Sequence, residues 1–145
     1  MRCRALRRLS RQLGRRGAFL LSFGFIWALI GYGMITAPQP DKRGLVVPLT
    51  WLPLWVWGCL WLAAGLVAIG SAFLPGRRDA PGFVALLVIV LPWGLGYLLS
   101  WWPLQTFPRG WIAASLYGAL GAAVVVVAGW AEPSRPKREV PPYER

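Results

Sequence analysis

The sequence predicts an all-α integral membrane protein: a bundle of four transmembrane helices, with both termini in the cytoplasm. Three observations support this fold class, namely the composition, four uncharged apolar runs and the distribution of Lys and Arg. Hydrophobic residues make up 57% of the chain and charged residues only 14%, and the mean hydropathy is +0.51. A water-soluble domain of 145 residues needs a more polar surface, so that class is excluded.

Each of the four apolar runs lacks Asp, Glu, Lys, Arg and His and is long enough to cross a bilayer. The runs cover residues 18–36, 51–74, 82–102 and 111–130. A helix rises about 1.5 Å per residue, so about twenty residues cross the hydrocarbon layer of about 30 Å. Since hydrocarbon offers no hydrogen-bond partner to the backbone, each run is predicted to be a helix.

The first run, residues 18–36, is interpreted as an uncleaved transmembrane helix. It contains nine Leu, Ile, Phe or Val residues, which contribute about −3 to −5 kcal/mol to insertion. A secretory signal is the alternative, because basic residues precede the run. Cleavage is disfavoured because Pro38 directly follows Ala37 and the run is longer than a signal core.

Prolines shape the second and third predicted spans. Pro53 is expected to fall in the first turn of the span 51–74, where its missing N–H needs no helical partner. Pro92 lies near the middle of the span 82–102 and is followed by two glycines, so a kink is predicted there. The sequence leaves open whether this kink is a hinge or a static bend.

The chain divides into a basic leader (residues 1–17), the transmembrane domain (18–130) and a charged, Pro-rich tail (131–145) that is predicted to be disordered. Leu6, Leu9 and Leu13 recur at helical spacing among the arginines of the leader. Two interpretations remain open: a short helix lying on the inner leaflet, or an unstructured basic segment.

The orientation follows from counting Lys and Arg on alternate sides of the four spans. Thirteen lie on the side of the two termini and three on the other side. Positive residues accumulate on the cytoplasmic side of a membrane, so both termini are expected in the cytoplasm. This topology accounts for the net charge of +11 and disfavours a nucleic-acid partner.

Tryptophans and small residues add two expectations about packing. Four tryptophans fall inside the spans: Trp27, Trp57, Trp61 and Trp93. Their indole N–H groups are expected either to find partners within the bundle or to make its interior partly polar. Small residues form ladders that predict helix-packing faces, within the chain, in a homo-oligomer or against another membrane protein. The ladders are Ala64, Ala68 and Ala72; Ala114, Gly118 and Ala122; and Ser115, Ala119 and Ala123.

No catalytic, cofactor-binding or metal-binding residues are predicted, and the chain is not expected to be an enzyme. It contains no His, and its carboxylates lie in the predicted loops and tail: Asp41, Asp79, Glu132, Glu139 and Glu144. Acid–base and metal-assisted chemistry depend on positioned groups of these types. Asp79 is interpreted as a solvated neighbour of Arg78, and the bilayer is the expected partner.

Arginine greatly exceeds lysine, and Trp27-Ala28-Leu29-Ile30-Gly31-Tyr32-Gly33 follows the leader. In these features the chain resembles small polytopic membrane proteins of high-GC actinobacteria and their phages, a group whose role is uncharacterised. The leading hypothesis, with the localisation that this resemblance implies, is a non-enzymatic accessory or structural protein of the bacterial inner (cytoplasmic) membrane. Two alternatives remain: a holin-like, membrane-permeabilising lysis protein of phage origin, and a passive channel or small transporter.

Overall fold

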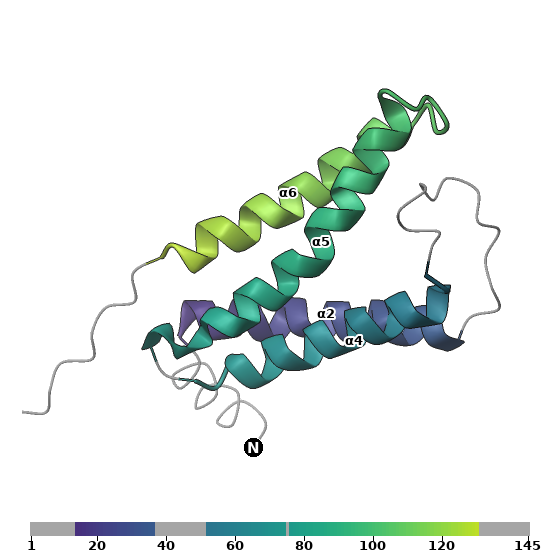
Figure 1. The fold of residues 1–145 in the computed structure, drawn as a ribbon. Helices are drawn as coiled ribbons and strands as arrows, with labels where there is room; N and C mark the ends of the chain where they lie inside the picture. Colours follow the sequence, from purple (N-terminus) through teal and green to yellow (C-terminus); the bar gives the residue numbers. More distant parts are fainter. Residues whose placement is uncertain (1–13, 37–51, 75, 131–145) are drawn as a thin grey trace, which may run out of the picture.

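Four long apolar helices, packed as two antiparallel hairpins, form the fold and confirm the predicted all-α class (Figure 1). The computed structural model describes residues 14–36, 52–74 and 76–130. The elements are α2 (Arg15–Thr36), α4 (Leu54–Ser71), the short 3-10 helix η1 (Gly76–Asp79), α5 (Ala80–Trp101) and α6 (Gly110–Ala128). Each of the four α-helices is long and apolar enough to cross a membrane.

The helices begin and end close to the predicted spans, with differences of a few residues. α2 begins at Arg15, so the last residues assigned to the leader are helical. α4 begins at Leu54 because Pro53 is its N-cap, with an extended ψ of 148°, and the prediction that Pro53 lies in the first turn is wrong. α5 continues through Pro92. The predicted leader helix and the tail lie outside the described residues.

Glycines bring α2 and α4 into direct backbone contact. A Cβ on Gly65 would lie 2.5 Å from the carbonyl oxygen of Gly24, and a Cβ on Gly31 would lie 2.6 Å from that of Gly58. The two glycines are seven residues apart on each helix, so the same face of each helix meets the partner twice. This register fixes the first hairpin, because only glycine permits so close an approach.

The small-residue ladder of α4 is buried, as predicted, whereas most of the ladder residues on α6 are not. Ala64, Ala68 and Ala72 retain at most 6% of their exposed surface and belong to the core. On α6, Gly118, Ala119 and Ala122 are exposed, together with Ser115. Within this chain, therefore, the α6 ladders are not packing faces, and their place in a homo-oligomer stays a prediction.

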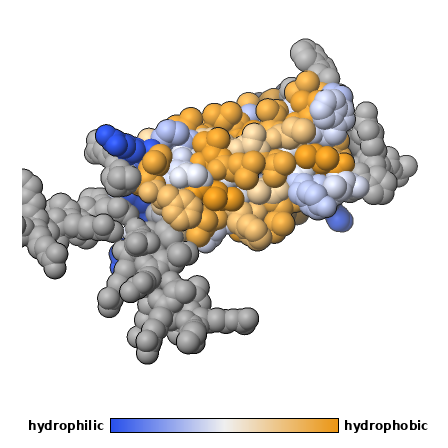
Figure 2. Space-filling model, turned by 90° about the horizontal axis from the view of Figure 1, so that it is seen from below, coloured by the Kyte–Doolittle hydropathy of each residue, from blue (hydrophilic) through white to orange (hydrophobic). Residues whose placement is uncertain are grey.

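The surface of the bundle is apolar between its two ends. Figure 2 shows one such face, on which hydrophobic residues dominate and hydrophilic residues gather near the ends. Large aliphatic side chains are more than half exposed on different helices, including Leu29 (55%), Val88 (60%) and Leu116 (62%). Hydrocarbon, and not water, suits such a surface. The chain is a multi-pass integral membrane protein in contact with the lipid bilayer.

Candidate functional site

A column of aromatic rings connects three of the four helices inside the bundle. Trp27 of α2, Trp61 of α4 and Trp93 of α5 are all at least 96% buried. The ring centres of Trp27 and Trp61 are 5.3 Å apart, and those of Trp61 and Trp93 are 5.9 Å apart in an edge-to-face arrangement. Such ring pairs contribute about 0.5–1.5 kcal/mol beyond their buried area.

The column continues to the fourth helix through two tyrosines. Trp93 lies 6.3 Å from the ring of Tyr97 and 6.2 Å from that of Tyr117 on α6. The two tyrosine rings stack with centres 5.7 Å apart and an interplanar angle of 11°. We call these five residues, Trp27, Trp61, Trp93, Tyr97 and Tyr117, the aromatic column.

For three of the four deep tryptophans, the structure shows no indole partner among the described residues, which leaves the alternative that their N–H groups make the interior partly polar. The Nε1 atoms of Trp27, Trp61 and Trp93 are buried and have no hydrogen-bond partner among the described residues. An unsatisfied buried donor costs about 1–3 kcal/mol relative to water. Hydrocarbon offers no acceptor either, so most of this desolvation cost arises when the helices insert into the membrane. Packing the rings against one another then adds little to that cost.

An ion pair fastens one end of the bundle. The Nη2 of Arg16 donates a hydrogen bond of 2.9 Å to Oδ1 of Asp79, and its Nε lies 2.9 Å from Oδ2 without the alignment of a hydrogen bond. The Nη1 donates to the backbone carbonyl of Trp130 at 3.2 Å. The guanidinium carbon lies 5.0 Å from the ring centre of Phe83. We call Arg16, Asp79 and the Trp130 carbonyl the terminal clasp.

The terminal clasp corrects the interpretation of Asp79 as a solvated neighbour of Arg78. Asp79 is 4% exposed, whereas Arg78 is exposed. The clasp joins the start of α2, the residue before α5 and Trp130, two residues after the end of α6. Both ends of the transmembrane domain therefore lie on the same side. Because the guanidinium engages both carboxylate oxygens, the arrangement suits a structural tie better than a catalytic base.

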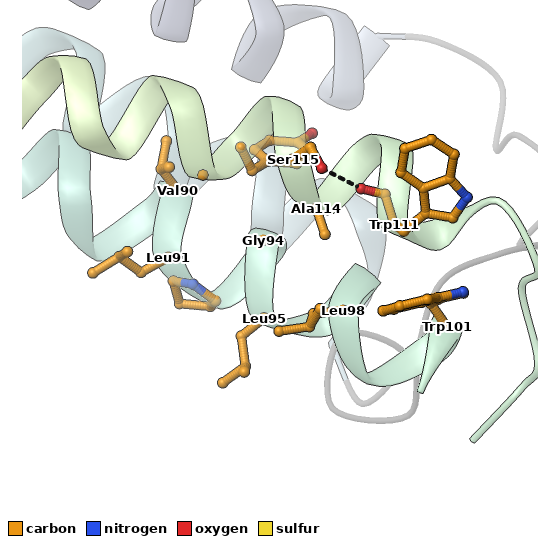
Figure 3. A pocket seen from close by; sticks show the side chains of 12 residues that line it. Val90, Leu91, Gly94, Leu95, Leu98, Trp101, Trp111, Ala114 and Ser115 are labelled. Atoms are coloured by element: carbon orange, nitrogen blue, oxygen red, sulfur yellow. Dashed lines mark hydrogen bonds between the residues drawn. The ribbon is translucent and has the colours of Figure 1, made fainter. Parts of the chain in front are cut away.

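A groove with a volume of about 850 Å³ lies between α5 and α6. Figure 3 shows its walls, formed by one face of each helix. Its lining residues are Val90, Leu91, Pro92, Gly94, Leu95, Leu98 and Trp101 of α5, and Trp111, Ala114, Ser115, Tyr117 and Gly118 of α6. We call this feature the α5/α6 groove.

The α5/α6 groove is apolar and opens to the lipid. Leu91, Leu95 and Leu98 are between 45% and 58% exposed. The hydroxyl of Ser115 donates a hydrogen bond of 2.8 Å to the Trp111 carbonyl, so it is already engaged (Figure 3). None of the lining residues is Asp, Glu, Lys, Arg, His or Cys. The groove can therefore hold an apolar ligand, and nothing in its walls suits acid–base chemistry.

The part of the chain that the structure describes contains no group of three or more His, Cys, Asp or Glu residues that could hold a metal ion. Cys59 is a free thiol exposed on α4. No family model matches the chain, and the comparisons with curated proteins and with solved structures give no match. The site must therefore be interpreted from its own geometry.

Proposed function

We propose that the protein is a non-enzymatic accessory or structural component of the bacterial cytoplasmic membrane, with both termini in the cytoplasm. The aromatic column is the observation that carries this proposal. It fills the space between the helices with interlocked rings from Trp27 to Tyr117 and leaves no charged side chain in the described interior of the spans. Ion-coupled transport requires an ionisable residue at that depth.

The distribution of charge supports the orientation. The terminal clasp lies at the end of the bundle that carries Arg15, Arg16 and Arg78. The alternation of the four spans assigns thirteen of the sixteen Lys and Arg residues of the sequence to this side. Positive residues are retained on the cytoplasmic side. The opposite end carries Arg109, one of only three basic residues on that side.

A holin-like role is the second candidate, and the exposed small residues of α6 favour it. Gly118, Ala119 and Ala122 would allow close approach of a second helix, and permeabilisation requires assembly of many copies. This role predicts that induced expression collapses the membrane potential. The structural role predicts an unchanged potential and unchanged viability.

The first test is solute flux. The purified chain, reconstituted in liposomes, is expected to pass K⁺, chloride and glycerol no faster than empty liposomes do. Trp93→Ala removes the ring at the centre of the aromatic column, and Trp130→Ala, outside it, is the matched control. Sustained and selective flux through the unaltered protein would refute the structural proposal and would favour a passive channel.

Orientation needs its own test, and the structure determines where to place the label. Single cysteines at positions 78 and 106, in a background lacking Cys3 and Cys59, are exposed at opposite ends of the described bundle. Position 79 is unsuitable because its side chain is buried in the terminal clasp. An impermeant maleimide added to intact cells is expected to label position 106 alone. Labelling of position 78 instead would reverse the orientation.

A further inference from the structure

The α5/α6 groove has the dimensions of a site for one lipid chain from one leaflet. Its lining residues on α5 run from Val90, near the middle of the span, to Trp101 at its end. The eleven steps from Val90 to Trp101, at a rise of about 1.5 Å each, give about 16 Å, which is about half of the hydrocarbon thickness of about 30 Å. The volume of about 850 Å³ is within the range of about 300–1,000 Å³ typical of ligand sites.

Two indoles mark the end of the groove that faces the headgroups. Trp101 and Trp111 both lie at the end next to the 102–109 loop, and Figure 3 shows their indole nitrogens turned toward that loop. They are 44% and 51% exposed. Indoles take this position at the membrane interface, with the ring in the acyl region and the N–H toward water. The polar part of an occupant therefore belongs at this end.

A basic residue precedes the helix at that end, because Arg109 is the N-cap of α6. Arg109 is two residues before Trp111, and its exposed side chain makes no ion pair or hydrogen bond within the described residues. Together with the apolar groove, this free guanidinium complements an amphiphile with an anionic head and a hydrocarbon chain. A guanidinium forms paired hydrogen bonds with phosphate as it does with carboxylate, and phosphate is the anionic group that every bilayer phospholipid carries.

We propose that the α5/α6 groove binds one anionic phospholipid, with an acyl chain along Leu95, Leu98 and Gly118 and its phosphate beside Arg109. The site lies in the leaflet that contains the 102–109 loop, so the proposal does not depend on which side of the membrane that loop faces. It also does not depend on the structural role proposed above.

The same observations disfavour two other occupants. A second copy of this chain would have to enter the groove with one of its own transmembrane helices, so the same length limit applies to it as to any partner helix. A transmembrane helix of a partner needs about twenty residues of contact path. The α5/α6 groove offers only about half of that length.

Glycine provides a substitution that fills the groove without disturbing the bundle. A Cβ on Gly118 would meet no atom within 4 Å, so Gly118→Leu places its side chain in the groove. The matched control is Gly33→Leu on α2, where a Cβ also meets nothing within 4 Å and which is not among the lining residues of the α5/α6 groove. Arg109→Gln removes the charge and leaves the groove intact, with Arg78→Gln as its control at the other end.

The test uses the full chain in phosphatidylcholine nanodiscs that contain a small fraction of a photoreactive lipid. The probe is phosphatidylglycerol or phosphatidylcholine with a diazirine in one acyl chain, and crosslinked residues are mapped by mass spectrometry. Phosphatidylglycerol is expected to label Leu95 and Leu98 more strongly than the equally exposed Leu29. Gly118→Leu is expected to abolish the excess, and Gly33→Leu to retain it.

Arg109→Gln is expected to remove the preference for phosphatidylglycerol at these positions, whereas Arg78→Gln leaves it unchanged. Labelling that simply follows exposure in all variants would overturn the proposal. Labelling of Leu95 and Leu98 that falls below that of Leu29, with crosslinks between copies through α6, would also overturn it and would assign the groove to a second copy.

Discussion

Replacing Gly65 by alanine should separate α2 from α4. The added Cβ would lie 2.5 Å from the Gly24 carbonyl oxygen and 2.6 Å from the Ala28 backbone nitrogen. Both obstacles are backbone, so no side-chain rotation relieves them. Restoring an ordinary contact of 3.4 Å requires a local separation of about 0.9 Å. A gap of about 0.5–1 Å forfeits about a quarter to a half of each dispersion contact.

Gly65→Ala is expected to lower the free energy of unfolding by about 1–3 kcal/mol, the range for overpacked cores. Alanine is intrinsically the better helix former by about 1 kcal/mol, so any net loss reports the clash. Gly70→Ala on the same helix is the matched control, since a Cβ there meets nothing within 4 Å. It is expected to be neutral or slightly stabilising.

The assay is reversible unfolding in mixed micelles by increasing SDS, followed by helical circular dichroism. Gly65→Ala should shift the midpoint to lower SDS, and Gly70→Ala should leave it unchanged or raise it. Equal midpoints for the two variants would refute the reasoning, because the α2/α4 backbone contact would then not limit stability. A shift of both to lower SDS would indicate a general effect of alanine in α4.

Three further predictions use the same assay. Asp79→Asn leaves a buried guanidinium without its carboxylate and should cost about 3 kcal/mol, whereas exposed Arg78→Gln should change the midpoint little; similar midpoints would argue against the terminal clasp. Trp93→Ala should cost about 3–5 kcal/mol, and Trp93→Phe clearly less, because it removes an unpartnered N–H along with part of the ring. Leu86→Ala, at a fully buried site, should cost about 2–5 kcal/mol, whereas Leu116→Ala, 62% exposed, should be nearly neutral; the reverse order would place α6 differently.

The four helices could be predicted because the signal is one-dimensional. An uncharged run of about twenty residues is a sufficient condition for a spanning helix, whatever it packs against. The ends of the helices were predicted less accurately, as at Pro53. Neither the N-cap nor the first turn needs a backbone N–H from proline, so the sequence does not distinguish these two positions. The burial of Ala64, Ala68 and Ala72 was also predicted, but the same spacing on α6 predicted packing for residues that are mostly exposed.

The candidate site depends on contacts between residues far apart in the sequence, and the spacing of residues along the chain does not predict such contacts. Arg16 and Asp79 are 63 residues apart, and either side chain could be solvated by water instead. Their contact therefore cannot be predicted before the arrangement of the antiparallel hairpins is known. Gly24 and Gly31 are seven residues apart, as are Gly58 and Gly65. This spacing could have predicted the α2/α4 contact, but a search for small residues four positions apart does not find it. The α5/α6 groove could not be predicted, because a ladder of small residues does not reveal whether a helix or lipid covers it.

Glycine has opposite effects in the two hairpins, and this contrast explains how the bundle can be rigid in one hairpin and able to bind a lipid at the other. At Gly24 and Gly65 the missing side chain is replaced by the backbone of the partner helix, so the α2/α4 pair is closed. At Gly118 nothing replaces it, and the space belongs to the α5/α6 groove. Since the aromatic column connects both hairpins, a lipid bound along α6 would press on Tyr117 and thereby on the rigid core. Binding at the groove would then stabilise the whole bundle, and the SDS midpoint should rise with anionic phospholipid in the unaltered chain but not in Gly118→Leu.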